Sequence, residues 1–313
     1  MDLSIVSGTA NEPLAAEIAR QLGRSLLPRT VRRFPDGEID LHLDHSVRGH
    51  DVYLVQPTSP PVDAPLLELL FLVDACRLAG AERVTAVVPY FGYARQDRRS
   101  RGREPLGARL VGRLLAGAGV DRLVAIDLHS AAIEGCFGFP VEHLTAVPAL
   151  AKVLRPMASR RAVIVSPDLG AVKLAERYAR ELELPVAVVH KQRLSGSEVR
   201  AIGVIGEVAG RDPIIIDDMI STGATIEAAV TAVRAAGARL PTIVAATHLL
   251  LVGNAAARIA ALSSCRLVGS DTVLFAQSQA GIETAQASVA RLLSQAIYSL
   301  HCDRTITELV SHA

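Results

Sequence analysis

The sequence predicts an α/β protein made of two doubly wound domains with mainly parallel sheets. Short runs of β-branched residues alternate with longer segments of helical periodicity, which is typical of β-α repeats. The strand-like runs are apolar throughout, as expected for parallel strands that are covered by helices on both faces. The chain has 313 residues, which is longer than a single domain of about 100 to 200 residues. Half of the residues are hydrophobic, which is enough for two cores.

The N-terminal half begins with a strand at 3–8 and a helix at 11–23. The segments 34–43 and 51–59 have alternating strand character around a turn at Asp36–Gly37, which predicts a local antiparallel excursion. A strand at 83–90, a helix at 104–119 and a strand ending at Asp127 follow.

The C-terminal half repeats the arrangement. A strand at 161–168 precedes a helix at 171–183, and a strand at 213–218 precedes a helix that begins at about Thr225. The best domain break lies near Thr145 to Pro156, where two βα series meet. We therefore expect an N-terminal domain of residues 1–146 and a C-terminal domain of residues 147–300. The tail 301–313 is expected to pack on one of the two domains, and the N-terminal domain is the first candidate.

Composition excludes several classes of protein. Lysine plus arginine (33) nearly balances aspartate plus glutamate (32), so overall charge favours neither nucleic-acid nor membrane binding. The four cysteines are far apart and form no CxxC pair, which argues against a disulfide framework or a zinc site. The N-terminus lacks the features of a signal peptide, and no apolar run reaches the roughly 20 residues of a membrane-spanning helix. We expect a cytoplasmic protein.

Ligands of doubly wound sheets bind beyond the carboxyl ends of the strands. The informative residues are therefore those that end predicted strands: Tyr90 to Arg98, Asp127, His129, Asp168, Asp217 and Asp218.

The stretch "PIIIDDMISTGAT", residues 213–225, combines a strand, an acid pair and a hydroxyl-rich loop that opens a helix. Backbone N–H groups, hydroxyls and the positive end of a helix dipole suit a phosphate. The two carboxylates can accept hydrogen bonds from vicinal sugar hydroxyls, so the pattern indicates a sugar phosphate. The simpler alternative is that Asp217 and Asp218 only end a strand and Thr225 only caps a helix.

A dense cationic cluster lies in "VVPYFGYARQDRRSRGREP", residues 87–105. Five arginines follow a strand end that carries aromatic residues, which favours polyphosphate binding over an ordinary basic surface loop. The arginines are Arg95, Arg98, Arg99, Arg101 and Arg103.

These motifs resemble those of the ribose-phosphate diphosphokinase (PRPP synthetase) family. The stretch 213–225 is similar to the phosphoribosyl-diphosphate loop, "PYFGYARQDRRSRGREP" to the ATP segment, and "FPDGE" at 34–38 to its partner for the adenine base. The likeness runs along nearly the whole chain. It implies phosphoribosyltransferase-like domains, the conversion of ATP and ribose 5-phosphate to AMP and 5-phosphoribosyl 1-diphosphate, Mg²⁺ as cofactor, and homo-oligomers built from dimers, often hexamers.

The resemblance also implies roles for particular residues. Lys191 and Arg193 are implied as catalytic, and His129 and Asp168 as metal-binding; without the family, His129 is read as a hydrogen-bonded strand-end histidine. The ATP segments at 34–38 and 95–98 are implied to bind ATP through Phe34, Asp36, Gly37, Glu38, Arg95, Gln96 and Asp97. The loop is implied to bind ribose 5-phosphate through Asp217, Asp218, Ser221, Thr222, Gly223, Ala224 and Thr225.

The match departs from the common pattern at Ser221, where an aspartate is usual. Ala132 and Glu134 likewise stand where glutamines are common. Two other functions remain open from the sequence alone. A phosphoribosyltransferase would share the loop without needing "FPDGE" or "YARQDR". A catalytically silent regulatory paralogue would be expected to lack the charged site residues that this chain retains.

Overall fold

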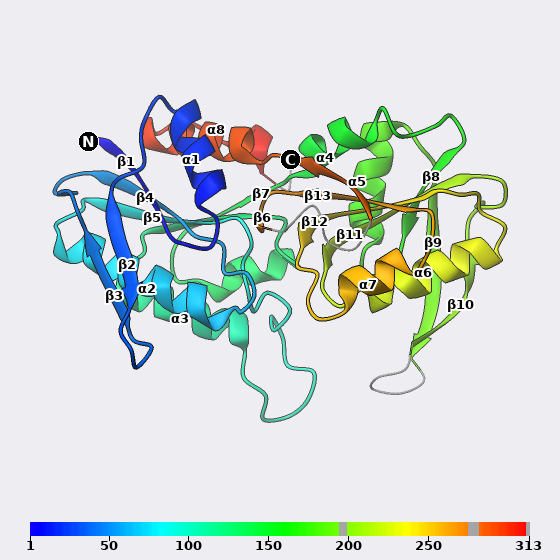
Figure 1. The fold of residues 1–313 in the computed structure, drawn as a ribbon, viewed down its shortest axis with the longest axis horizontal. Coiled ribbons are helices and arrows are strands. Elements are labelled where there is room, and N and C mark those ends of the chain that lie inside the picture. The colour runs from blue at the N-terminus through cyan, green and yellow to red at the C-terminus, as the bar shows by residue number, and fades with distance from the viewer. Residues whose placement is uncertain (194–198, 275–281, 311–313) are drawn as a thin grey trace. The chain divides into compact units, whose positions relative to one another are not determined.

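The chain forms two compact units, which are described separately (Figure 1). The computed structural model describes residues 1–193, 199–274 and 282–310, and for residues 191–193 and 199–202 the backbone only. Unit 1 contains Met1–Thr145, Thr272–Leu274 and the chain from Val289 onward. Unit 2 contains Ala146–Asp271 and, of the later described residues, 282–288. No helix among the described residues is long and apolar enough to cross a membrane.

Unit 1 is built around a parallel sheet with the strand order β1-β4-β5-β6-β7. Four of its strands, β1, β4, β5 and β6, are mainly apolar and almost completely buried, as expected for strands with helices on both faces. In chain order the elements are β1 (Leu3–Ser7), α1 (Glu12–Gln21), β2 (Arg29–Arg33), β3 (Ile39–Leu43), β4 (Asp51–Val55), α2 (Asp63–Leu78), β5 (Arg83–Val88), α3 (Gly107–Ala118), β6 (Arg122–Ile126), the 3₁₀ helix η1 (Ala131–Cys136) and β7 (Val141–Leu144).

The winding of unit 1 reverses at β1. After α1 the chain returns beside the outer edge of β1, where Ile5 and Leu26 form a parallel bridge, and it then crosses to β4 on the other side of β1. Because the crossovers are right-handed, this reversal places α1 and α8 on one face of the sheet and α2 and α3 on the other (Figure 1). The doubly wound prediction is confirmed for this unit.

The β2–β3 hairpin is a separate two-stranded sheet. The predicted antiparallel excursion with a turn at Asp36–Gly37 is confirmed, but its second strand was predicted wrongly. The turn joins 29–33 to 39–43, whereas 51–55 is β4 of the main sheet, between β1 and β5. All five residues of β4 are buried, so they belong in the covered sheet, whereas β2 ends in two exposed arginines.

Unit 2 is built around a seven-stranded sheet with the order β10-β9-β8-β11-β12-β13-β14, in which only β10 is antiparallel to its neighbour. In chain order the elements are α4 (Val147–Leu154), β8 (Ala162–Ser166), α5 (Val172–Leu182), β9 (Val186–Arg193), β10 (Val199–Ile205), β11 (Asp212–Ile220), α6 (Ala224–Ala235), β12 (Thr242–Leu249), α7 (Ala255–Ala260), β13 (Cys265–Ser270) and β14 (Glu283–Ala287).

The winding of unit 2 reverses between β8 and β11. From β8 the chain moves outward through α5 to β9 and β10, and then returns to β11 on the other side of β8. Helices α4 and α5 consequently cover one face and α6 and α7 the other (Figure 1). At such a reversal, the crossover connections diverge to opposite faces and leave a crevice at the carboxyl ends of the two strands.

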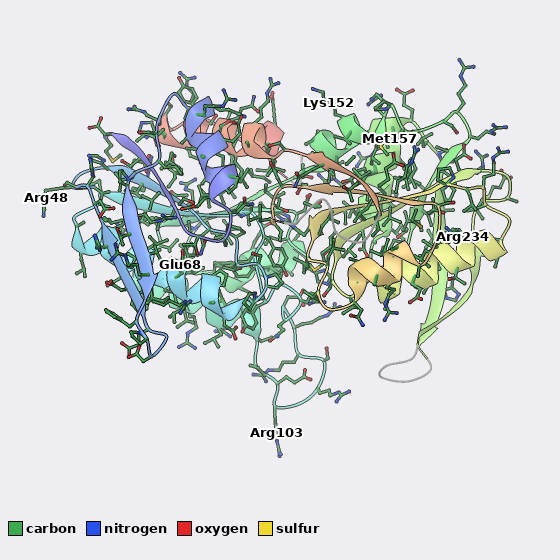
Figure 2. All side chains as sticks on the ribbon, viewed as in Figure 1. Arg48, Glu68, Arg103, Lys152, Met157 and Arg234 are labelled. Atoms are coloured by element: carbon green, nitrogen blue, oxygen red, sulfur yellow. The ribbon has the colours of Figure 1, made fainter. Side chains whose placement is uncertain are left out.

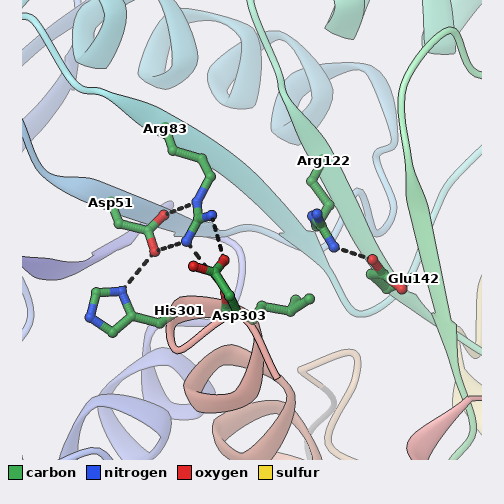
Figure 3. Close-up of polar contacts among 7 residues, drawn as sticks. Asp51, Arg83, Arg122, Glu142, His301 and Asp303 are labelled. Atoms are coloured by element: carbon green, nitrogen blue, oxygen red, sulfur yellow. Dashed lines mark hydrogen bonds and ion pairs between the residues drawn. The ribbon is translucent and has the colours of Figure 1, made fainter. Parts of the chain in front are cut away.

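The C-terminal helix α8 (Ala290–His301) belongs to unit 1 and packs against α1. The 3₁₀ helix η3 (Thr307–Leu309) follows it. The prediction that residues 290–300 belong to the C-terminal domain is wrong, because they lie in unit 1. The apolar face of α8 is buried against unit 1, and His301 and the carbonyl of Leu300 bind the polar ends of β4 and β5 (Figure 3).

Candidate active site

The reversal point of unit 2 carries the acid pair predicted from the sequence. Asp168 follows β8, and Asp217 and Asp218 lie near the carboxyl end of β11. The prediction that the pair ends the strand is slightly wrong, because β11 continues to Ile220. The neighbouring strand β12 extends as far as Leu249 and pairs with Met219 and Ile220. This pairing extends β11 beyond the acid pair.

Three carboxylates repel one another at this point. Burial, followed by the charges of Asp218 and Asp168, raises the pKa of Asp217 well above its usual value. Backbone N–H groups offset part of the repulsion: that of Asp218 donates to Asp217 Oδ1 at 3.0 Å, and that of Met219 to Asp218 Oδ1 at 2.8 Å. Asp168 Oδ1 accepts from Gly170 N at 3.0 Å. Donor hydroxyls or a cation would relieve the remaining repulsion.

The loop after β11 turns directly into α6. Gly223 has a φ of +77°, in the left-handed region, and its C-terminal neighbour Ala224 is the first residue of α6. A Cβ on Gly223 would lie 3.4 Å from Arg258 Cδ and 3.5 Å from the Ala255 carbonyl oxygen, so the loop packs against the start and middle of α7. The resulting helix N-terminus, beginning one residue before the predicted position, presents N–H groups beside the three carboxylates.

In unit 1, the carboxyl end of β6 leads into a tight turn that presents His129. Asp127 has a φ of +39°, Leu128 is buried, and His129 is exposed. The hydroxyl of Ser130 then accepts from Ala132 N at 3.1 Å and caps η1.

The arginine-rich segment comes next to this turn. Its aromatic start is anchored in the core, where the rings of buried Phe91 and Phe137 lie 5.4 Å apart in an edge-on arrangement. Further along, Asp97 lies close enough to Cys136, at the end of η1, that its charge adds to burial in raising the pKa of that thiol. The structure thus brings the predicted ATP residues around Asp97 and the turn that carries His129 into one region of unit 1.

The arginines themselves lie on a projecting loop. The Arg98 side chain is 87% exposed, and Arg103 stands at the outer tip of the loop (Figure 2). Glu104 Oε2 accepts from the N–H groups of Ser100 and Arg101 at 2.9 Å each, which shapes the loop from within. Guanidinium groups on a projecting loop are available to an anion that approaches from solvent.

The "FPDGE" turn forms the tip of the β2–β3 hairpin. Phe34 N donates to the Glu38 carbonyl and Gly37 N to the Phe34 carbonyl, both at 2.9 Å, and Asp36 Oδ1 accepts from Glu38 N at 3.1 Å. This leaves the Phe34 ring 49% exposed. Among the described residues, no hydrogen bond or ion pair joins this turn to Arg95, Gln96 or Asp97.

Lys191 and Arg193 lie in the last three residues of β9, and their side chains are outside the described part of the structure. Their backbone pairs with Ala201 and Val199 of β10, and because the pairing of the two strands begins at Val188 and Ile205, the two residues lie at the far end of an antiparallel ribbon.

Two part-buried carboxylate contacts were missed in the sequence. At the reversal point of unit 1, Glu68 accepts from Thr9 N and Thr9 Oγ1, both at 2.6 Å. On η1, Glu134 pairs with His143. No local motif marks either contact, because the first joins positions 59 residues apart and the second depends on η1 folding over β7.

Unit 2 carries an acid pair and a phosphate-binding type of loop at the reversal point of its sheet. These features define it as a phosphoribosyl-binding class of domain. In agreement, residues 146–278 match the phosphoribosyl transferase domain, and residues 3–119 match the N-terminal domain of ribose phosphate pyrophosphokinase. The ribose-phosphate pyrophosphokinase of Rhodopirellula baltica is 43% identical over 311 residues, 98% of each chain. That of Staphylococcus saprophyticus is 41% identical over 98% of this chain and 96% of its own.

A solved structure shows the same architecture. The crystal structure of phosphoribosylpyrophosphate synthetase from Mycobacterium smegmatis has a TM-score of 0.90 and 37% identity, and the match covers 97% of this chain and 100% of that one. The chain belongs to the ribose-phosphate pyrophosphokinase family and is an enzyme of that family. The resemblance stated from the sequence is confirmed.

Proposed function

We propose that this enzyme transfers the β,γ-diphosphoryl group of ATP to the 1-hydroxyl of ribose 5-phosphate, giving 5-phosphoribosyl 1-diphosphate and AMP. The observation that carries the proposal is the acid pair beside a helix N-terminus at the reversal point of unit 2, in a chain that aligns with ribose-phosphate pyrophosphokinases over 98% of its length. Catalysis of this kind depends mainly on positioning and charge neutralisation, because no covalent enzyme intermediate is needed.

Ribose 5-phosphate binding is assigned to the end of β11 and the start of α6. Asp217 and Asp218 accept hydrogen bonds from the vicinal sugar hydroxyls, which relieves the repulsion that raises the pKa of Asp217. The 5-phosphate lies on the loop, which offers backbone N–H groups and three side-chain hydroxyls. The loop residues are Ser221, Thr222, Gly223, Ala224 and Thr225.

ATP binding is assigned to two projections of unit 1. The segment with Arg95, Gln96 and Asp97 binds the polyphosphate end, and the hairpin tip with its exposed Phe34 ring binds the adenine base. Because these projections share no hydrogen bond or ion pair among the described residues, we propose that a second copy of the chain supplies one of them. The remaining hairpin residues of this assignment are Asp36, Gly37 and Glu38.

Lys191 and Arg193 are proposed to neutralise the charge that develops on the transferred diphosphoryl group. A lysine point charge and an arginine fork suit this task, since the oxygens of the β-phosphorus carry the negative charge in the transition state. Their place at the far end of the β9–β10 ribbon supports a position that can close over the substrates.

Magnesium is proposed as the cofactor, with His129 and Asp168 as metal-binding residues. The carboxylates around Asp217 form an oxygen-rich, negatively charged site that suits a hard cation. No group of three or more potential ligands is preassembled within the described part of the chain, which agrees with Mg²⁺ taking one or two protein ligands together with substrate phosphates. The ion would neutralise charge on the diphosphoryl group.

A homo-oligomer built from dimers is supported by an apolar surface patch, which we name the α2–α3 patch. It consists of exposed side chains at helical spacing on two packed helices, and exposed apolar clusters of this kind mark interaction surfaces. The residues are Leu67, Phe71 and Leu78 on α2 and Leu110 and Leu114 on α3. A cytoplasmic location is supported by the four unpaired cysteines.

The experiment is to incubate the purified protein with MgATP and ribose 5-phosphate and to quantify AMP and 5-phosphoribosyl 1-diphosphate. We expect equal amounts of both from the wild type, and a loss of activity in Lys191→Ala. A protein that yields no AMP, as a regulatory paralogue would, contradicts the proposal. So does a Lys191→Ala variant with full activity.

A further inference from the structure

A hydrogen-bonded chain of three residues supports the turn that presents His129. Leu128 N donates to His143 Nε2 at 2.9 Å, and His143 Nδ1 lies 2.9 Å from Glu134 Oε1. The imidazole is 5% exposed and the Glu134 side chain 32%. Leu128 precedes His129 directly, so one end of this chain of contacts is part of the turn itself.

The direction of the hydrogen bonds fixes the protonation of the imidazole. A backbone N–H can only donate, so Nε2 must offer a lone pair to Leu128. The ring proton is then on Nδ1, where it is donated to the Glu134 carboxylate. A carboxylate on Nδ1–H holds both the tautomer and the orientation of the ring, as it does for histidines elsewhere that act through their second nitrogen.

The turn needs such support because its backbone is unusual. Asp127 has a φ of +39°, in the region that non-glycine residues rarely adopt and that persists only when the surroundings hold it. Strand β7 provides two consecutive acceptors. The Leu144 carbonyl accepts from Asp127 N at 3.0 Å, and His143 Nε2 accepts from Leu128 N. Two successive amide groups on either side of the left-handed residue are therefore fixed to β7.

The helix that carries Glu134 is itself held in place. Ile133 is completely buried in the core of unit 1. On the other side, η1 approaches α3 so closely that a Cβ on Gly112 would lie 2.8 Å from the Cys136 carbonyl oxygen. Glu134 is thus carried on a rigidly packed element, which lets it orient His143 rather than follow it.

We propose that Glu134 and His143 form a positioning pair that fixes the Asp127–His129 turn and so places the His129 side chain for the reaction. The pair acts through the backbone of Leu128 and does not touch substrate. This inference rests on the proposed function for its effect on catalysis, whereas the tautomer of His143 can be tested without any activity.

The catalytic test compares two substitutions of the same histidine. His143→Gln places an amide oxygen at the position of Nε2, so an acceptor for the Leu128 N–H is kept. His143→Leu fills the same space without an acceptor. We expect kcat to fall about tenfold in His143→Leu, the lower end of the effect of removing a residue that orients a ligand, and to stay within about twofold of wild type in His143→Gln. Glu142→Ala removes a carboxylate from the same strand, where it pairs with Arg122, and should leave kcat unchanged.

The spectroscopic test uses long-range ¹H–¹⁵N NMR of histidine-labelled wild type near pH 7.5, with the His143→Gln spectrum assigning the resonance. We expect a protonated Nδ1 and an unprotonated Nε2, and a loss of this single tautomer in Glu134→Ala. An Nε2–H tautomer or a charged ring overturns the proposal, even if His143→Leu fails to fold. Equal loss of kcat in the glutamine and leucine variants, or no loss in either, also overturns it. A wild type that is inactive but shows the expected tautomer refutes the proposed function and leaves the pair intact.

Discussion

Asp217 shows how binding and stability oppose each other at a single side chain. Its pKa is raised by burial and by the charges of Asp218 and Asp168, so the ionised form is disfavoured in the folded protein. Between the ordinary carboxyl pKa and this raised value, the folded state binds more protons than the unfolded state. Stability of the ligand-free protein therefore falls as the pH rises through that interval.

We predict that Asp217→Asn stabilises the ligand-free protein while it weakens substrate binding. Removing the charge should raise Tm at pH 8, and the difference from wild type should shrink as the pH is lowered towards 4. Loss of a charge-assisted hydrogen bond should raise the KM for ribose 5-phosphate about tenfold. Thermal melting at several pH values and initial rates measure the two effects. An unchanged KM would show that this carboxylate does not bind the sugar.

Gly223 sets the start of the phosphate-binding helix. Its φ of +77° costs an alanine about 1–2 kcal/mol, and the backbone shift needed to relieve that strain moves N–H groups of the loop. We predict that Gly223→Ala lowers Tm and raises the KM for ribose 5-phosphate. Gly210, with a φ of +69° and open space around its Cβ position, provides the matched control. If Gly210→Ala raises the KM equally, the effect belongs to general destabilisation.

At the scale of elements, a buried ion cluster ties α8 to the sheet of unit 1. Asp51 is fully buried at the start of β4 and accepts from Arg83 Nε at 2.8 Å and from His301 Nδ1 at 2.8 Å (Figure 3). Burial alone would raise the pKa of Asp51, but the hydrogen bonds from Arg83 and His301 outweigh it and hold the pKa below its ordinary value. The resulting stability is present above the ordinary carboxyl pKa and is lost as the pH falls through the lowered one.

We predict that Asp51→Asn destabilises the protein by about 3 kcal/mol at pH 7, because the Arg83 guanidinium loses its buried counter-charge and His301 loses its carboxylate acceptor. Urea unfolding at pH 7 and at a pH well below the ordinary carboxyl pKa should show a smaller difference at the lower pH. Glu17→Gln removes a solvent-exposed ion pair with Arg20 and should have a much smaller effect. Equal effects of the two substitutions would mean that burial does not strengthen the cluster.

Periodicity and strand ends determined how much could be predicted at this scale. The apolar run at 213–216 and the loop after it identified the reversal-point site of unit 2, because both signals are local in sequence. The partner of the 39–43 strand was predicted wrongly because alternation alone does not tell an edge hairpin from a covered strand. The Glu134–His143 and Glu68–Thr9 contacts depend on how separate elements pack, and no spacing in the sequence encodes them.

At the scale of the whole molecule, assembly is expected to depend on the α2–α3 patch. Phe71 and Leu114 are 44% exposed on neighbouring helices, and burying them against another copy would contribute about 25 cal/mol per Å² of apolar surface. We predict that Phe71→Glu combined with Leu114→Glu reduces the mass measured by light scattering, whereas Ile205→Glu, on an exposed strand of unit 2, does not. A wild type that is monomeric, or a double variant of unchanged mass, would contradict this role of the patch.

The proposed enzyme moves a diphosphoryl group as one piece. The most direct measurement follows [γ-³²P]ATP with ribose 5-phosphate and Mg²⁺ and identifies the labelled product. We predict that the label appears in 5-phosphoribosyl 1-diphosphate, at its terminal phosphorus, with one AMP formed for each label transferred. Label in a sugar bisphosphate together with ADP, or label released as inorganic phosphate, would contradict it.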